Sequence, residues 1–209
     1  GELPALVAAG MAHPRDAVML AAARGKAMGE AARQRSGSML AVSGMDERSV
    51  AAAIALFASC GTLVVAAVNA PTQVVVSGDA VLVAEAERSL SGKKGVKATV
   101  LRVAGAWHSP HMLPAAEAFT AALDRLDLAF EAKGRDAAPM IFNRHGHTAS
   151  GPKDVRELLA GQLESPIRFD AVMRKMAELK VTDFVEIGPG GVLRGLVRLN
   201  LPDPALRVH

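Results

Sequence analysis

The sequence predicts an α/β protein in which a compact module of strands and helices is inserted into a larger body. Half of the 209 residues are hydrophobic, which is enough to bury a sizeable core. Residues 36–103 read in the order β-α-β-β-α-β, and after residue 104 strands alternate with helices, as they do around parallel sheets. We therefore expect two units: an inserted module at 36–103, and a body formed by 1–35 and 104–209.

The chain opens with two predicted helices. Leu3, Leu6 and Val7 follow a helical pattern that Gly10 is well suited to end. A longer helix is predicted from about Pro14 to Arg35, because its apolar residues recur at helical spacing and proline is tolerated in a first turn.

The inserted module alternates short apolar strands with two helices. Its β-branched runs are separated by turn residues, and Asp46 stands where a helix cap is expected. In chain order the predicted elements are the strand Ser38–Ser43, a helix from Asp46 to about Cys60, the strands Thr62–Val68 and Gln73–Ser77, a helix from Asp79 to about Gly92, and the strand Val96–Val103. This is the order of a ferredoxin-like unit, so we expect a four-stranded antiparallel sheet with both helices on one face.

The remainder of the body also mixes helices and strands. In chain order we predict a loop from Gly105 to His111, a helix from about Pro114 to Leu126, a linker from Glu131 to Ala138, the strand Met140–Phe142, helices near Pro152–Leu163 and Pro166–Leu179, the strand Thr182–Ile187, a glycine-rich turn at 188–191, and a last helix to about Leu199. Such alternation implies a parallel layer.

The composition excludes several classes of function. The 24 Lys and Arg residues nearly balance 21 Asp and Glu, and six Phe, one Trp and no Tyr provide no platform on which bases could stack, so nucleic acid is not an expected partner. Cys60 is the single cysteine, so neither an intrachain disulfide nor a multi-thiolate metal site can form. No run approaches the ~18 apolar residues of a membrane span. We expect a cytoplasmic protein that has no membrane partner.

Two side chains are candidates for chemistry. His108 lies in a loop after a predicted strand, where α/β proteins place catalytic groups, and histidine is well suited to act as a base near neutral pH. Arg24 interrupts the apolar face of its helix with a guanidinium that can bind a carboxylate through two hydrogen bonds. The residues alone leave open the ordinary alternatives, an exposed loop histidine and a solvated helix arginine.

Two further patterns are weaker. His108, His111, His145 and His147 contain zinc-binding side chains, but no carboxylate motif accompanies them and no metal is expected. The turn GPGG at 188–191 is similar to a nucleotide-binding turn. Leu193 stands where that motif requires glycine, so a tight turn explains these glycines better.

Six segments, taken in order, resemble one enzyme family. They are GELPALVAAG (1–10), ARGKAM (23–28), VNAPTQVVVSG (68–78), WHSPHM (107–112), QLESPIRF (162–169) and EIGPGGVL (186–193). They are similar to the helix after the nucleophile motif G-H-S-x-G-E, to the R-G-x-x-M, N-x-P-x-Q-x-V-x-S/A-G and F-H-S-P-x-M motifs, and to two late motifs of malonyl-CoA:acyl-carrier-protein transacylases and polyketide synthase acyltransferase domains. The resemblance spans essentially the whole chain.

The resemblance implies an α/β-hydrolase-like body with the ferredoxin-like subdomain inserted, and an acyltransferase. In the family, a serine takes the malonyl group from coenzyme A and passes it to the phosphopantetheine thiol of an acyl carrier protein. By motif match, His108 is the catalytic base, the backbone carbonyl of Gln162 orients it, and Arg24 holds the malonyl carboxylate. The remaining substrate-binding positions implied by the match are Met28, Asn69 and Trp107. The coenzyme A thioester is a substrate, and no cofactor is expected.

The chain departs from the family pattern at three points. Gly1 matches the second glycine of the nucleophile motif, so we expect the serine and the oxyanion-hole segments upstream. This chain alone should therefore not catalyse acyl transfer. Ala67 replaces a common asparagine, which removes one polar contact. Trp107 replaces the usual phenylalanine, and a bulky aromatic beside the base favours malonyl over methylmalonyl.

Three alternatives stay open from the sequence. The chain could belong to the malonyl-transfer component of a malonate decarboxylase, or to the extender-unit acyltransferase of a polyketide synthase. It could also be a non-catalytic module that docks an acyl carrier protein through a basic surface. Flanking ketosynthase or carrier domains would indicate a synthase, and their absence a free-standing enzyme. A G-H-S-x-G motif upstream separates a catalyst from a docking module.

Overall fold

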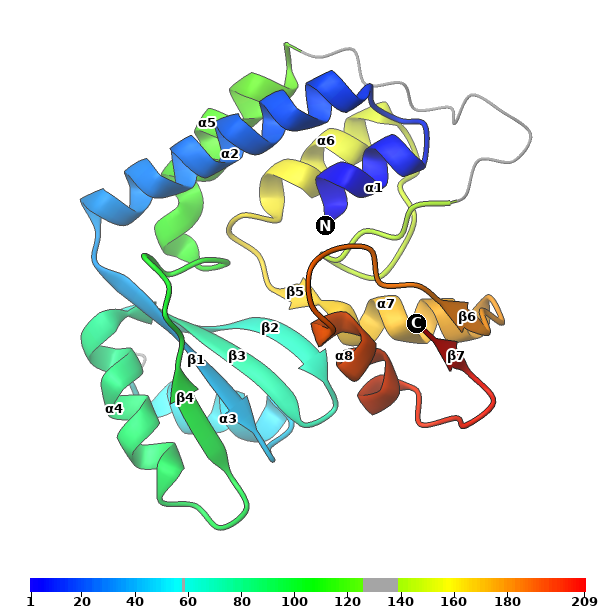
Figure 1. The fold of residues 1–209 in the computed structure, drawn as a ribbon. Helices are drawn as coiled ribbons and strands as arrows, with labels where there is room; N and C mark the ends of the chain where they lie inside the picture. Colours follow the sequence, from blue (N-terminus) through cyan, green and yellow to red (C-terminus); the bar gives the residue numbers. More distant parts are fainter. Residues whose placement is uncertain (58, 126–138) are drawn as a thin grey trace.

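The computed structural model describes residues 1–57, 59–125 and 139–209. The helices are α1 (Glu2–Ala8), α2 (Pro14–Gln34), α3 (Glu47–Ile54), α4 (Ala80–Ser91), α5 (Leu113–Leu123), α6 (Pro152–Gly161), α7 (Phe169–Glu178) and α8 (Val192–Asn200), with 3-10 turns η1 (Ala55–Phe57) and η2 (Pro110–Met112). The strands are β1 (Gly37–Ser43), β2 (Leu63–Ala70), β3 (Gln73–Asp79), β4 (Lys97–Val100), β5 (Ile167–Arg168), β6 (Asp183–Phe184) and β7 (Arg207–Val208). Figure 1 shows α1, α2, α5 and α6 gathered in one layer, with the larger sheet below it.

The larger sheet confirms the ferredoxin-like order. Its strands run β4-β1-β3-β2-β5, and the first four pair antiparallel. β5 then joins the edge of β2 in parallel, which makes the sheet mixed and confirms the α/β class. The ferredoxin-like sheet is thereby extended by a strand that lies almost a hundred residues further along the chain.

Alternation along the strands gives the sheet two apolar faces. Leu40 and Val42 of β1 point into a core shared with α3 and α4, so both helices cover one face as predicted. Met39 and Val75 point the other way and pack against Trp107 and its neighbours in the body. The module therefore has its own core on one side and rests on the body with the other.

The helical layer has a separate core. α2 packs against α1 and α5, and its buried residues recur along one face, as the sequence predicts. Leu20 and Met28 on α2 and Phe119 and Leu123 on α5 are buried in this core. This apolar packing fixes the position and rotation of α2. The direction of the side chains on the other faces of α2 is thereby fixed as well.

Two predicted strands of the body are corrected. Met140–Phe142 is not a strand, since Phe142 forms only an isolated bridge to His147. Thr182–Ile187 is reduced to the two residues of β6, which pair with β7. Backbone hydrogen bonds continue one step on either side of this pair, from the N–H of Arg207 to the carbonyl oxygen of Thr182 (2.9 Å) and from the N–H of Glu186 to that of His209 (3.1 Å), whereas Ile187 beyond them is 93% exposed.

Helix ends differ from the prediction at two places. The helix that begins after Asp46 ends at Ile54 instead of Cys60 and tightens into η1, where Leu56 is 79% exposed and packs on no core. The helix predicted from Pro166 begins only at Phe169, because β5 pairs with β2 first.

The predicted linker from Glu131 to Ala138 lies outside the described residues. Within the described ranges, no helix is both long and apolar enough to cross a bilayer.

Candidate active site

The loop after β4 holds His108 in a constrained backbone conformation. The φ angle of His108 is +59°, a left-handed conformation that costs a non-glycine residue about 1–3 kcal/mol and persists only where its surroundings impose it. The surroundings do so here: the backbone N–H of His108 donates to the carbonyl oxygen of Leu163 (3.2 Å), and the Ser109 hydroxyl donates to the carbonyl oxygen of Ala106 (2.7 Å). Met112, three residues beyond Ser109, is fully buried. Such strained conformations cluster at functional sites.

A second hydrogen bond fixes the imidazole of His108. Its Nδ1 lies 2.9 Å from the backbone carbonyl oxygen of Gln162, so Nδ1 carries the proton that it donates to that oxygen. The lone pair of the neutral ring is then on Nε2. Burial lowers the pKa of His108, and the nearby charge of Arg24 lowers it further, whereas hydrogen bonds of the ring with the backbone of Gln162 and Ser165 raise it. A neutral, oriented histidine is what general base catalysis near pH 7 requires.

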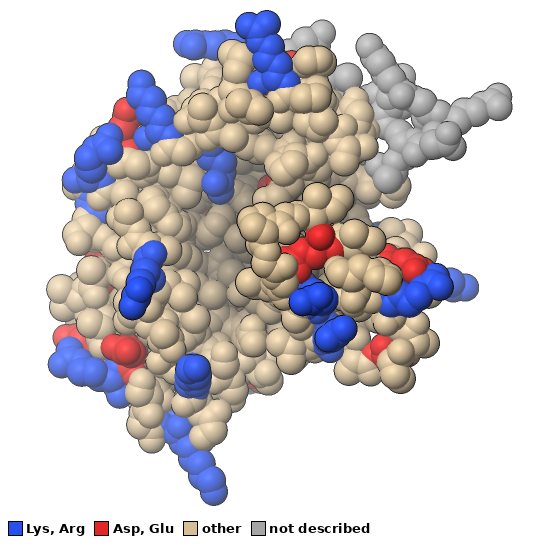
Figure 2. Space-filling view, viewed as in Figure 1, with Lys and Arg blue, Asp and Glu red and all other residues tan. Residues whose placement is uncertain are grey.

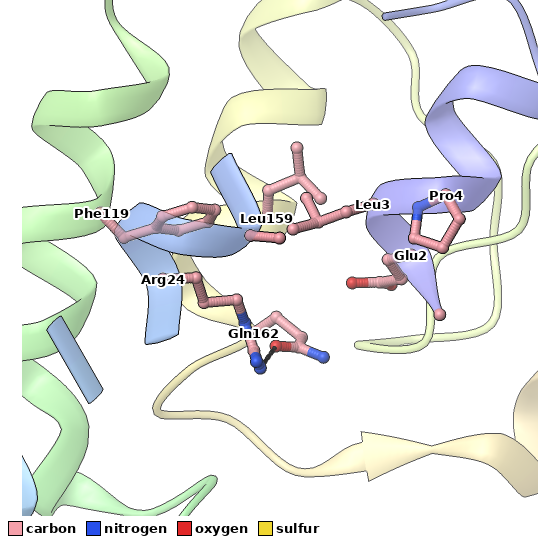
Figure 3. Close-up of a pocket in the computed structure, with 9 residues that line it drawn as sticks. Glu2, Leu3, Pro4, Arg24, Phe119, Leu159 and Gln162 are labelled. Atoms are coloured by element: carbon pink, nitrogen blue, oxygen red, sulfur yellow. Dashed lines mark hydrogen bonds between the residues drawn. The ribbon is translucent and has the colours of Figure 1, made fainter. Parts of the chain in front are cut away.

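A cavity of about 240 Å³ lies between α1, α2, α5 and α6, with Arg24 on its wall. The residues that line it are Gly1, Glu2, Leu3, Pro4, Ala21, Arg24, Phe119, Leu159 and Gln162. Nη2 of Arg24 donates to the side-chain oxygen of Gln162 (2.9 Å), and Figure 3 shows the two side chains side by side. Burial lowers the pKa of Arg24 and the charge of Glu2 opposes this, but an arginine stays protonated in proteins.

Glu2 is a residue of this cavity that was not among the predicted site residues. Its Oε1 accepts from the backbone N–H of Asn143 (2.7 Å), and burial raises the pKa of its carboxyl group, against that hydrogen bond and the charge of Arg24, which lower it. In Figure 3 the Glu2 carboxyl group faces Gln162 and Arg24. A signal was present in the sequence, because Glu2 matches the last residue of the nucleophile motif.

Three of the predicted site residues meet at one place. Gln162 contacts His108 through its backbone and Arg24 through its side chain, although Arg24 precedes it by 138 positions. These contacts join the end of α6 to α2 and to the loop before η2.

The other three predicted substrate-binding residues lie elsewhere, and the described lining of the cavity includes none of them. Met28 is buried in the core of the helical layer, and Trp107 packs between that core and the sheet. Asn69 accepts a hydrogen bond through its backbone carbonyl from the side chain of Asn200 (2.7 Å). Their roles toward a substrate stay predictions.

The four histidines do not assemble. In the described part of the chain, no group of three or more His, Cys, Asp or Glu side chains could hold a metal ion. His111 lies 3.2 Å from Asp79, and His145 and His147 lie against each other with ring centroids 5.3 Å apart. The histidines thus serve separate local contacts.

The glycine-rich turn is a tight turn, as expected. Gly188 and Gly190 have φ angles of +146° and +113°, which favour glycine. The carboxylate of Glu186 accepts from the backbone N–H groups of Leu193 (3.1 Å) and Arg194 (2.9 Å) at the start of α8. These are the groups that would bind a phosphate in a nucleotide site, and the chain's own carboxylate occupies them.

The charges on the face shown in Figure 2 form no single patch. Lys and Arg side chains are scattered over this face, and Asp and Glu lie among them. The positive charge that matters for the site is the partly buried one at Arg24.

The chain is similar to known proteins over almost its whole length. The acyl transferase domain family matches residues 1–201. A malonyl CoA-acyl carrier protein transacylase of Bacillus subtilis is 39% identical over 201 residues, which are 95% of this chain and 61% of that protein.

Solved structures give the same result. The malonyl-CoA:acyl carrier protein transacylase of Xanthomonas oryzae has a TM-score of 0.89 and 32% identity, over 99% of this chain and 64% of that one. The structure of a type II polyketide acyl-carrier protein in complex with its malonyl-transacylase matches with a TM-score of 0.87 and 30% identity, over 97% of this chain and 64% of that one. The chain thus spans about three fifths of the length of the proteins that it resembles.

Proposed function

Because the chain belongs to the acyl transferase domain family, we propose that it is the part of a malonyl-CoA:acyl-carrier-protein transacylase that holds the base and the donor-selecting arginine. One observation carries the proposal: Gln162 joins His108 and Arg24, at 2.9 Å in each case. A base suited to acyl transfer and a cation suited to a carboxylate are thereby held at a fixed separation. A malonyl thioester presents a thioester carbonyl and a carboxylate, one group for each of these two side chains.

The proposed reaction has two transfers that use the same nitrogen. The nucleophilic serine is placed on a segment that precedes residue 1 in the full-length protein. Nε2 of His108 takes the proton of the serine hydroxyl as the oxygen attacks the thioester, the C–S bond breaks, and the coenzyme A thiolate leaves with the proton. The phosphopantetheine thiol of the carrier protein then gives its proton to Nε2 and attacks the ester. The C–O bond breaks, and the serine regains its proton.

Arg24 determines the donor in this proposal. Its guanidinium has five N–H donors, and within the described part of the chain the side chain of Gln162 accepts one hydrogen bond from it. The remaining donors are available for the malonyl carboxylate. The apolar side chains of Phe119 and Leu159 beside it exclude water and strengthen that contact. The reaction requires no cofactor, and its substrates place the enzyme in the cytoplasm.

The test uses the full-length protein with malonyl-CoA, acetyl-CoA and a phosphopantetheinylated acyl carrier protein. We expect the mass of the carrier protein to increase by that of one malonyl group, and kcat/KM to be much lower for acetyl-CoA than for malonyl-CoA. Arg24→Ala should reduce kcat/KM for malonyl-CoA by roughly 30- to 4,000-fold, as loss of one partner of a desolvated charged hydrogen bond does, and should reduce it far less for acetyl-CoA. Arg33→Ala, at an exposed position of the same helix, is the matched control.

Two outcomes would contradict the proposal. Binding of the carrier protein without any transfer would favour a docking module. Equal losses for both donors in Arg24→Ala would assign this arginine to the fold or to the coenzyme A moiety. Carrier proteins of the fatty-acid and polyketide types, compared side by side, identify the acceptor.

A further inference from the structure

We propose that the side chain of Gln162 is a specificity-determining positioning residue, whose neutral amide aims the guanidinium of Arg24 at the carboxylate of the donor without cancelling its charge. This inference rests on the proposed function. It assigns a role to the side chain, in addition to the backbone carbonyl that orients His108.

The geometry places the amide where it can act in this way. Gln162 caps the end of α6, its backbone N–H donates to the carbonyl oxygen of Leu158 (3.1 Å), and the residue is 8% exposed. Its side-chain oxygen accepts from Nη2 of Arg24 at 2.9 Å. A flexible arginine is thus held by a residue that is itself fixed by the helix end. Figure 3 shows the Gln162 side chain lying between Arg24 and Glu2.

The chemical nature of the acceptor is the central point. An amide oxygen can orient a guanidinium through one hydrogen bond, but it carries no charge and leaves the positive charge available. A carboxylate at the same position would form an ion pair with Arg24 and compete with the donor. Among the residues described as lining this cavity, Glu2 is the acidic one, and its Oε1 accepts from the backbone N–H of Asn143. The cavity therefore holds an oriented cation that forms no ion pair with a described carboxylate, while the charge of Glu2 acts on it from a greater distance.

Variants at position 162 can separate the two roles of this residue. Gln162→Ala removes the amide and keeps the backbone carbonyl that accepts from His108. We expect the ratio of kcat/KM for malonyl-CoA to that for acetyl-CoA to fall by about 10- to 100-fold, since a hydrogen bond to a charged group is lost. Gln162→Glu should lower the same ratio further, by about 100-fold or more, because the new carboxylate repels the malonyl carboxylate and pairs with Arg24.

The order of the two variants distinguishes positioning from a structural role. A side chain needed only for packing would be replaced better by glutamate than by alanine, because glutamate has nearly the same size. Gln34→Ala and Gln34→Glu, at an exposed glutamine near the end of α2, are the matched controls and should leave the ratio unchanged. An unchanged ratio in both Gln162 variants, or a smaller loss in Gln162→Glu than in Gln162→Ala, would overturn the proposal.

A binding measurement keeps this inference separate from the proposed function. Sodium malonate and sodium acetate are titrated into the full-length protein and into Gln162→Glu, and the Nε–H resonance of Arg24 is followed by NMR. Malonate should shift the resonance in the parent and not in Gln162→Glu, whereas acetate should have little effect in either. If the parent transfers no malonyl group, the proposed function fails, and this titration still decides the role of Gln162. If both proteins bind malonate equally, or if neither binds it, the proposed role of Gln162 is overturned.

Discussion

At the residue scale, the candidate site depends on a histidine that the fold holds in two ways. The backbone N–H and Nδ1 of His108 both donate to carbonyl oxygens of the segment that follows α6, at Leu163 and Gln162. Its left-handed φ angle shows that these contacts outweigh the local preference of the backbone. The ring therefore has one orientation and one tautomer, and its remaining nitrogen is free to exchange protons with a substrate.

The pH dependence of transfer should report this environment. The base must be neutral, and burial lowers the pKa of His108 below its ordinary value of 6.5, so the acid limb of kcat/KM for acetyl-CoA should lie below pH 6.5. In Arg24→Ala the limb should move to higher pH, because the charge that disfavours the imidazolium is removed. His108→Ala should lose the limb together with about 10²- to 10⁴-fold in rate. A limb that stays in place in Arg24→Ala would show that the two side chains do not interact.

At the element scale, the junction of β3 and α4 ties the module to the end of α2. The Asp79 carboxylate does not cap α4; it accepts from the backbone N–H of Thr62 (2.6 Å) and from the guanidinium of Arg35 (3.0 and 3.1 Å). His111, which is buried, lies 3.2 Å from the same carboxylate. Three segments distant in sequence meet at this carboxylate, and one of them is the loop that carries His108.

The close approach of strands at this junction should make Gly78 irreplaceable. A Cβ atom at Gly78 would lie 2.0 Å from the carbonyl oxygen of Thr62, a backbone atom that cannot move without disturbing β2. Gly78→Ala should lower the free energy of unfolding by about 1–3 kcal/mol or more, as overpacking of a core does. Gly25→Ala is the matched control: nothing lies within 4 Å of its Cβ position in α2, and it should raise stability by about 0.5–1 kcal/mol. Urea unfolding measures both, and equal effects would contradict the packing argument.

At the scale of the whole molecule, the helical layer and the module have separate apolar cores. The core under α3 and α4 is formed by buried residues from positions 40–90 alone, whereas the core of the helical layer combines buried residues from positions 6–31 and 112–163. The two parts meet through the second face of the sheet, through β5, and through the ion pair between Arg168 and Glu47 (2.6 Å). The boundaries of the module at 36–103 stay a prediction.

Excision of the module should test those boundaries. Residues 36–103 expressed alone should unfold cooperatively in urea, because their core needs no residue from the body. Their stability should be lower than that of the full-length protein, since Met39 and Val75 lose their cover. Val76→Asp in the excised module is the control, because a buried charge in this core should abolish the transition. If the excised residues 36–103 without any substitution show no cooperative transition, the module and the body form one folding unit.

The sequence by itself determined the β-α-β-β-α-β order, the long helix from Pro14, and three residues of the candidate site. β-branched runs, turn residues and helical spacing are local signals, because each element's periodicity is set by which of its faces is buried. Motif order then indicated His108, Arg24 and Gln162.

Only the tertiary structure decided how these residues are joined. The contact between Arg24 and the Gln162 amide spans 138 positions, and no periodicity encodes which fixed helix end a given arginine will meet. The same holds for the strand predicted at Thr182–Ile187, which is reduced to Asp183–Phe184 because its hydrogen bonds depend on how far its partner extends. Local patterns determine which face of an element is buried, whereas the ends of elements and the pairing between distant segments follow from the packing of the whole chain.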